Sequence, residues 1–338
     1  MKWPIERIFN VTWELNGFCT KASLGENLMT VEKGYNFKEM LGKMRVPVIA
    51  APMFLVSGPD LVTACCRSGV IGSFPTINAR TPEILNEWLI QIKSDLEASP
   101  SAMPAAVNLV VHRTNERLAA DLDLVVEHQI PLTIASVGNP TPVVERVHQY
   151  GGIVLADVAT VRHARLAIDA GVDGLILLCG GAGGNTGWLN PFAFVADVRE
   201  FYDGPLGVAG SIACGRAIRA IEVLGADFAY IGTHFISATE SMAVDGYREM
   251  IVESKADDIK LTDEVTGIPA NFLRPSMERA GFKPTRNKND AFSVEHELEA
   301  FRAWKDVWSA GQAVGRTKKI CSVETIVAEL ESEYRQLK

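Results

Sequence analysis

Short runs of apolar residues, rich in Val, Ile and Leu and with little polar alternation, recur through the middle of the chain. A strand buried on both faces gives such a continuous run, whereas a half-exposed antiparallel strand alternates. Each run is followed by a loop and then by a stretch with helical periodicity and charges on one face. Eight runs predict strands, which begin at Val46, Val70, Ala105, Leu132, Ile153, Gly174, Pro205 and Phe228.

The order of these elements, strand then helix in eight successive units, predicts the fold. Strands joined by helices pair in parallel, and eight such units close into a barrel. We therefore predict an α/β protein with a TIM (β/α)8 barrel over residues 46–255. A doubly wound open sheet is the alternative, but its usual set of about five or six strands would leave units unexplained.

Two segments lie outside this repeat. Residues 1–45 hold no comparable unit and are expected to form an N-terminal extension packed on the barrel. Residues 256–338 begin irregularly and then show two helix-patterned stretches, the first interrupted at Gly311. We predict a C-terminal, mostly helical addition that covers the barrel mouth.

The charge balance argues against some partners. The chain has 338 residues, with 33 Lys and Arg against 41 Asp and Glu, a formal net charge of −8 and no basic cluster. Phosphate backbones need concentrated positive charge, so no nucleic-acid partner is expected.

The first ten residues lack an apolar stretch, and no apolar run reaches the roughly 18 residues that span a bilayer. We expect a cytoplasmic protein without a membrane partner, whose six cysteines are free thiols because none forms a C-x-x-C pair.

In barrels of this type the catalytic face is the rim at the carboxyl ends of the strands. Residues that are unusual for a strand end collect there and are the candidates for chemistry. Neither the H-E-x-x-H spacing of zinc enzymes nor a G-x-S-x-G elbow occurs, so no metal and no hydrolase is expected. The candidates are Pro52, Met53, Asn78, His112, Ser136, Asp157, Gly183, Gly184, Asn185, Gly210, Ser211, Gly232 and Thr233.

The segment CGGAGGNTGWLNPF, which starts at Cys179, is the sharpest local signal. Glycines permit positive φ and let backbone N–H groups approach a ligand, so a flat or anionic ligand is expected nearby. A Rossmann fingerprint needs G-x-G-x-x-G and an acidic residue after the next strand, and neither is present. A tight turn is the plain structural alternative. The loops after strands seven and eight suit a phosphate, because the first runs straight into a helix start.

In these motifs the chain resembles the nitronate monooxygenase family. These are FMN-dependent TIM barrels related to flavin-dependent enoyl-ACP reductases and NADH:quinone reductases. The likeness runs from about Val46 to Glu240. Its specific parts, in chain order, are APM at 51–53, PTINARTPE around Asn78, VRHARLAIDAGVDGLI, GGAGGNTG and GADFAYIGTHFISATE.

The resemblance implies roles for the rim residues. Backbone groups of Pro52 and Met53 would meet the flavin ring, and Asn78 would hydrogen-bond its edge. The lack of Lys and Arg in the glycine loops agrees with a phosphate held by backbone donors. The other residues expected at FMN are Gly183 and Gly184 near the isoalloxazine, Gly210, Ser211, Gly232 and Thr233 at the phosphate, and Ser136 and Asp157 at the rim.

Two positions depart from the family pattern. Where the family usually has a histidine that removes the α-proton of a neutral nitroalkane, this chain has Asn185. An amide cannot act as a general base near neutral pH, although it can donate a hydrogen bond to a nitro oxygen. His112 is the best substitute base, with a structural role as its alternative. Asp157 stands where some relatives carry Lys, and an ionised carboxylate there would oppose negative charge on a reduced flavin; a helix cap is the structural alternative.

We therefore expect an FMN-dependent oxidoreductase of nitronate monooxygenase type that oxidises alkyl nitronates with O2, with Asn185 and His112 as the catalytic candidates. An NAD(P)H-dependent flavin oxidoreductase acting on quinones or enoyl thioesters is the first alternative. A flavin-binding barrel without catalysis, or a sugar-phosphate barrel without flavin, is an alternative of another class. The sequence leaves the oligomeric state open, because an apolar helix face can pack internally or against a partner.

Overall fold

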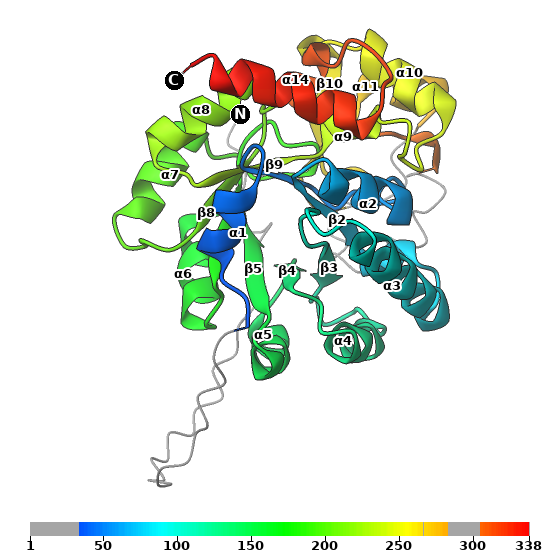
Figure 1. Cartoon of the computed structure of the whole chain (residues 1–338). Helices are drawn as coiled ribbons and strands as arrows, with labels where there is room; N and C mark the ends of the chain where they lie inside the picture. The colour runs from blue at the N-terminus through cyan, green and yellow to red at the C-terminus, as the bar shows by residue number, and fades with distance from the viewer. Residues whose placement is uncertain (1–33, 266, 283–304, 338) are drawn as a thin grey trace, which may run out of the picture.

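A closed barrel of eight parallel strands, ringed by helices, forms the body of the molecule (Figure 1). The computed structural model describes residues 34–265, 267–282 and 305–337. The barrel closes where β1 pairs with β9, with Ile49 opposite Tyr230. The predicted TIM barrel is therefore confirmed. Its strands are β1 (Val48–Ala50), β2 (Ile71–Pro75), β3 (Ala106–Val110), β4 (Leu132–Ser136), β5 (Ile153–Val158), β6 (Gly174–Leu178), β8 (Leu206–Ala209) and β9 (Phe228–Ile231).

Helices alternate with these strands, and local sequence explains where several begin. Thr81, Thr160 and Asn190 each cap a helix by accepting a hydrogen bond from a backbone N–H of the first turn. Gly225 ends a helix in the left-handed conformation, at φ 106°. The helices around the barrel are α2 (Pro59–Arg67), α3 (Pro82–Glu97), α4 (Leu118–Glu127), α5 (Thr141–Val147), α6 (Val161–Asp169), α7 (Pro191–Arg199), α8 (Gly215–Leu224), the short α9 (Thr233–Ile236) and α10 (Asp245–Glu253).

Apolar side chains fill the barrel interior and leave one end for chemistry. Inward-facing Ile49, Ile134 and Ile176 are fully buried inside the strands. At the amino end of the barrel, Phe37 of α1 (Phe37–Lys43) packs edge-on against Phe228, with ring centroids 5.4 Å apart. This apolar packing of α1 closes the amino end of the barrel, so a ligand has to enter from the carboxyl ends of the strands.

The parts of the C-terminal addition lie at different positions on the barrel. β10 (Ile259–Thr262) and β11 (Ala270–Leu273) join β7 (Gly184–Asn185) in a small antiparallel sheet beside the mouth. α11 (Arg274–Arg279) and the 3-10 turn η5 (Gln312–Arg316) lie on the same side of the barrel. The expectation of a mostly helical addition missed the small sheet, because these strands are too short for a periodic signal.

The last helix, α14 (Val323–Arg335), does not lie over the mouth. It packs against α8 and α2 on the outside of the barrel (Figure 1). The reason is its apolar face, where Val323, Ile326 and Leu330 are buried in the layer between strands and helices. The prediction that the whole addition covers the mouth is thus wrong for α14, and residues 1–33 and 283–304 lie outside the described part. None of the described helices has both the length and the apolar character to cross a bilayer.

Candidate active site at the barrel mouth

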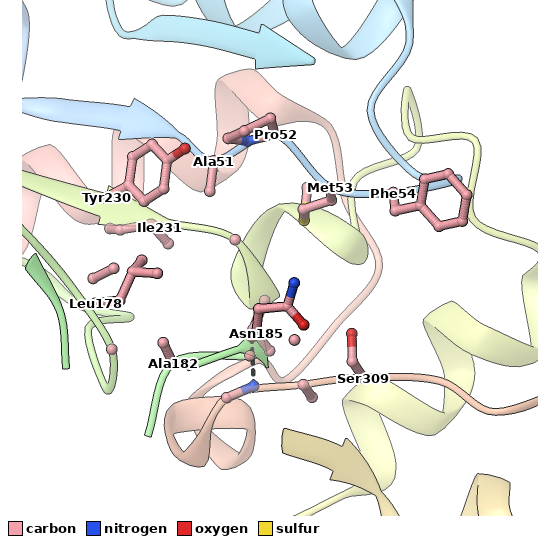
Figure 2. Close-up of a pocket in the computed structure, with 18 of the residues that line it drawn as sticks. Ala51, Pro52, Met53, Phe54, Leu178, Ala182, Asn185, Tyr230, Ile231 and Ser309 are labelled. Atoms are coloured by element: carbon pink, nitrogen blue, oxygen red, sulfur yellow. Dashed lines mark hydrogen bonds between the residues drawn. The ribbon is translucent and has the colours of Figure 1, made fainter. Parts of the chain in front are cut away.

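A cavity opens at the carboxyl ends of the strands, and we call it the mouth cavity. Loops after β1, β2, β4, β6, β8 and β9 line it, together with residues of β3 and β5 and the tail segment 309–313. Figure 2 shows the Asn185 amide directed into this space, with Ser309 on the side of the tail. The structure brings together eleven of the thirteen candidates from the sequence: Pro52, Met53, Ser136, Asp157, Gly183, Gly184, Asn185, Gly210, Ser211, Gly232 and Thr233.

One half of the mouth cavity is made of glycine loops packed against the tail. The backbone N–H of Gly311 donates to Thr233 Oγ1 at 2.8 Å, and that of Gln312 donates to the Gly181 carbonyl at 2.9 Å. A Cβ on Gly183 would lie 2.7 Å from the Gly311 nitrogen, so only glycine permits this approach. Among the described residues, no Lys or Arg lines the cavity. An anion here would have to be held by backbone N–H groups and hydroxyls.

The start of α8 differs from the expectation for a phosphate site. The backbone N–H of Gly215, in the first turn of α8, already donates to Glu333 Oε2 of α14 at 3.0 Å. The cavity lining includes Gly210, Ser211 and Ile212 but not the residues of α8. Ser211 sits at φ 59°, an uncommon conformation for a side-chain-bearing residue. The loop itself, rather than the helix start, faces the cavity.

The other half of the mouth cavity is a chain of polar side chains from three neighbouring strands. Asn108 Nδ2 on β3 donates to Ser136 Oγ on β4 at 2.5 Å, and Ser136 Oγ donates to Asp157 Oδ2 on β5 at 2.5 Å. Burial raises the pKa of Asp157 to about 6, against the lowering effect of the Ser136 hydroxyl. Thr160 caps α6, so the alternative role of Asp157 as a helix cap is wrong.

Two buried polar atoms lining the cavity have no hydrogen-bond partner in the described part of the chain. These are the Tyr230 hydroxyl oxygen and Asn185 Oδ1. Burial raises the pKa of Tyr230 well above its ordinary value, so the phenol stays protonated and can donate. Orphaned polar groups are rare in folded proteins and cost free energy unless a ligand meets them. Their position marks the mouth cavity as a binding site.

The sequence reasoning missed Asn108 and Tyr230. Asn108 sits in the middle of AVNLV, and Tyr230 within FAYIG, next to the glycine loop after β9. A polar group inside an otherwise apolar inward-facing run was the available signal in both cases. The prediction rested on residues at the strand ends, whereas Asn108 lies within β3 and Tyr230 within β9, and both line the mouth cavity.

Asn78 and His112 do not line the mouth cavity. Asn78 Nδ2 donates to the carbonyls of Met53 and Ser57 at 3.0 and 2.8 Å, and Asn78 Oδ1 accepts from the Leu55 N–H at 3.0 Å. Asn78 therefore fixes the loop that carries Pro52 and Met53. His112 lines a neighbouring pocket and its Nδ1 lies 2.8 Å from Thr114 Oγ1.

Ser309 reaches the mouth from the C-terminal tail and is held there by aromatic packing. The Tyr247 hydroxyl donates to the Ser309 carbonyl at 2.6 Å, and the Tyr247 ring stacks on Trp308 with centroids 4.9 Å apart. The guanidinium carbon of Arg279 lies over the Trp308 ring, 3.8 Å from the ring centroid. Segments distant in sequence thus complete the cavity wall.

Comparison with known proteins gives a family and a fold. The model of the nitronate monooxygenase family matches residues 91–333. A Mycobacterium tuberculosis protein named as a monooxygenase is 32% identical over 230 residues, which are 63% of this chain and 61% of that protein. A nitronate monooxygenase of Paraburkholderia phytofirmans is 25% identical, over 86% of this chain and 92% of the relative. The structure of FabK from Thermotoga maritima superposes with a TM-score of 0.77 at 24% identity, over 89% of this chain and 96% of that one.

Proposed function

The chain belongs to the nitronate monooxygenase family, a family of flavin-dependent oxidoreductases, and we propose that it is an FMN-dependent enzyme that oxidises alkyl nitronates with O2. The observation that carries the proposal is the mouth cavity itself. Glycine and hydroxyl loops from distant parts of the chain meet there, without a cationic side chain among the described lining residues.

The residues present fit FMN. The loops with Gly210, Ser211, Gly232 and Thr233 offer N–H and hydroxyl donors for its phosphate. The Tyr230 hydroxyl, which has no partner among the described residues, is a buried donor for a polar ring atom. The loop after β1, held by Asn78, presents Pro52 and Met53 to the same space, and we assign Asn78 to the cofactor site through this loop.

The side chains determine which substrate form reacts. When bound, FMN supplies the redox chemistry, accepting electrons from the substrate and passing them to O2. Asn185 can donate a hydrogen bond to a nitro oxygen, but it cannot remove an α-proton. A nitronate is already deprotonated and needs no base. Met53, Leu178 and Ile231 line the same cavity with apolar side chains, which would limit the access of water to the reacting carbon.

The remaining polar groups receive supporting roles in this proposal. We assign Ser136 and Asp157 to the polar side of the FMN site, because both line the mouth cavity. Because His112 faces a neighbouring pocket, we propose only a minor contribution from it to the oxidation of nitronates. The variant His112→Gln is expected to keep most of kcat/KM for a nitronate; a loss of a hundredfold or more would assign it a direct part in the reaction.

The first experiment is the visible spectrum of the purified protein, which we expect to show bound oxidised flavin. Anaerobic mixing with a nitronate should bleach it, whereas rapid bleaching by NADH alone would favour an NAD(P)H-dependent reductase. A yellow protein inert to both would favour flavin binding without catalysis. A colourless protein that cannot be reconstituted with FMN would overturn the assignment.

The decisive kinetic comparison is between a nitronate and its neutral nitroalkane. We expect kcat/KM to be at least about a hundredfold higher for the nitronate, since general-base catalysis contributes on that order. The variant Asn185→His restores the family residue and should raise kcat/KM for the neutral nitroalkane far more than for the nitronate. Equal kcat/KM for both forms in the wild type would refute the role given to Asn185.

A further inference from the structure

A second pocket adjoins the mouth cavity, and we call it the side pocket. It has a volume of about 150 Å³ and lies between β4, β5 and α6. The two spaces share four lining residues, namely Val137, Asp157, Leu178 and Asn185. Asn185 in particular faces both. The side pocket therefore adjoins the mouth cavity at Asn185, beside the place where the reacting group of a substrate would lie.

Small side chains create the side pocket. On the outer face of the barrel, Ala135 of β4 stands directly opposite Ala156 of β5 in the sheet register. Ala167 of α6 faces them across the layer, and Ala159 lies in the loop between. This layer is otherwise densely filled by large apolar side chains, so four alanines in one place leave room for about one ligand group.

The lining of the side pocket is mostly apolar and offers little to a charged ligand. Burial lowers the pKa of both His112 and His163, so these rings are uncharged near neutral pH. The Thr186 hydroxyl already donates within its own loop, with the carbonyls of Cys179 and Gly187 at 3.0 and 2.9 Å. Asp157 belongs equally to the mouth cavity. Desolvating a hydrocarbon here is favourable, whereas desolvating an ion is not.

We propose that the side pocket holds the unbranched alkyl chain of the substrate while the nitronate head lies at Asn185 in the mouth cavity. The inference deepens the proposed function and rests on it. An apolar cavity of about 150 Å³ admits a molecule the size of benzene, so a chain of about six carbons fills the side pocket. The substrate class is thus the medium-chain primary nitronates.

The test is a chain-length series of primary nitronates, from that of nitroethane to that of 1-nitrooctane. In the wild type, kcat/KM should rise about fourfold per CH2 until the pocket is full, near six carbons, and then level off. The variant Ala167→Leu places three extra carbon atoms in the side pocket and should end the rise about three carbons earlier. Ala156→Val should end it about two carbons earlier, and it keeps the test informative if the first variant folds poorly. Ala120→Leu, on the exposed face of α4, is the matched control and should follow the wild type.

Calorimetric binding of neutral n-alkyl carboxamides to the holoprotein gives a readout independent of turnover. Affinity should increase with chain length in the wild type and Ala120→Leu, and stop increasing early in Ala167→Leu. If carboxamide affinity rises with chain length but no nitronate is turned over, the proposed function is overturned while the assignment of the side pocket to an alkyl chain is supported. Flat chain-length profiles, or profiles that the two filling variants leave unchanged, would overturn the pocket assignment.

Discussion

The two halves of the mouth cavity are built from different materials. The half beside β6, β8 and β9 consists of glycine loops and backbone groups, packed directly on the tail segment 309–313. The half beside β3, β4 and β5 consists of a chain of side chains, Asn108, Ser136 and Asp157. The first half should be sensitive to any added atom and insensitive to pH, and the second half should show the opposite behaviour.

The largest effect is expected when one carbon atom is added to the glycine half of the mouth cavity. In Gly183→Ala the new Cβ would lie 2.7 Å from the Gly311 nitrogen and 2.9 Å from the Ala310 carbonyl carbon. Overpacking against backbone costs about 3 kcal/mol, so the dissociation constant for FMN should rise about a hundredfold. Fluorescence titration of the apoprotein with FMN measures it. Gly42→Ala, whose Cβ meets nothing within 4 Å, is the matched control and should bind FMN like the wild type.

A comparable effect, which depends on pH, is expected from removing the charge of the side-chain half. The pKa of Asp157 in the folded protein, about 6, lies above its ordinary value of 3.8. The folded chain therefore binds more protons than the unfolded chain between these values, and stability falls as pH rises through this window. Asp157→Asn should thus raise the free energy of unfolding at pH 7 by about 3 kcal/mol, with the gain fading toward pH 4.

Urea unfolding of the apoprotein at pH 4, 5, 6 and 7 checks this prediction. The exposed Asp203→Asn serves as a control for the loss of one negative charge. A gain for Asp157→Asn that is the same at every pH would show that ionisation of Asp157 is not its cause.

The next prediction concerns the hydrogen bond from Ser136 to Asp157, which partly offsets the rise in the Asp157 pKa that burial causes. Ser136 Oγ donates to Asp157 and lowers the pKa of that carboxyl, so Ser136→Ala should raise it further, by about one unit or 1.4 kcal/mol. The titration of the Asp157 carboxyl carbon, followed by NMR, measures the shift. Ser136→Thr keeps a hydroxyl and should leave the titration near that of the wild type; an unchanged pKa in Ser136→Ala would remove the hydrogen bond as a cause.

The smallest expected effect is on Tyr230, which lines the same cavity. Its hydroxyl has no partner among the described residues, so Tyr230→Phe should stabilise the apoprotein by about 1 kcal/mol while weakening FMN binding by about fivefold. Thermal unfolding without and with FMN separates the two effects. The matched control is Tyr150→Phe, because the Tyr150 hydroxyl donates to the Ile130 carbonyl at 2.8 Å and its loss should destabilise both forms. A destabilised Tyr230→Phe apoprotein would contradict the reading of an orphaned group.

Three of the four non-glycine residues with positive φ in the described part of the chain lie at the mouth; the fourth, Gln129, precedes β4. Leu55, Val137 and Ser211 have φ near 60°, and they lie in the loops after β1, β4 and β8. Such conformations cost free energy and persist where the surroundings impose them, commonly at functional sites. Both halves of the mouth carry this local strain, so the loops are held in place by tertiary contacts such as that of Asn78 with the Leu55 N–H.

Much of the fold follows from local pattern. Each of the eight predicted apolar runs contains a barrel strand, because a strand buried on both faces must be apolar at consecutive positions. The order of strand and helix then allows one parallel pairing scheme and places the chemistry at the carboxyl ends. For this reason the glycine loops, Ser136, Asp157 and Asn185 were located from the sequence.

Only the tertiary structure decided which rim residues share a space. Asn78 turns into the loop after β1, and His112 faces the side pocket, although both stand at strand ends like the cavity residues. In the C-terminal tail, the backbone N–H of Gly311 donates a hydrogen bond to Thr233 at the mouth, while α14 packs on the outside of the barrel. Periodicity along the chain encodes local structure and the side that is buried, but the direction of a loop side chain and the contacts between distant segments depend on how the whole molecule packs.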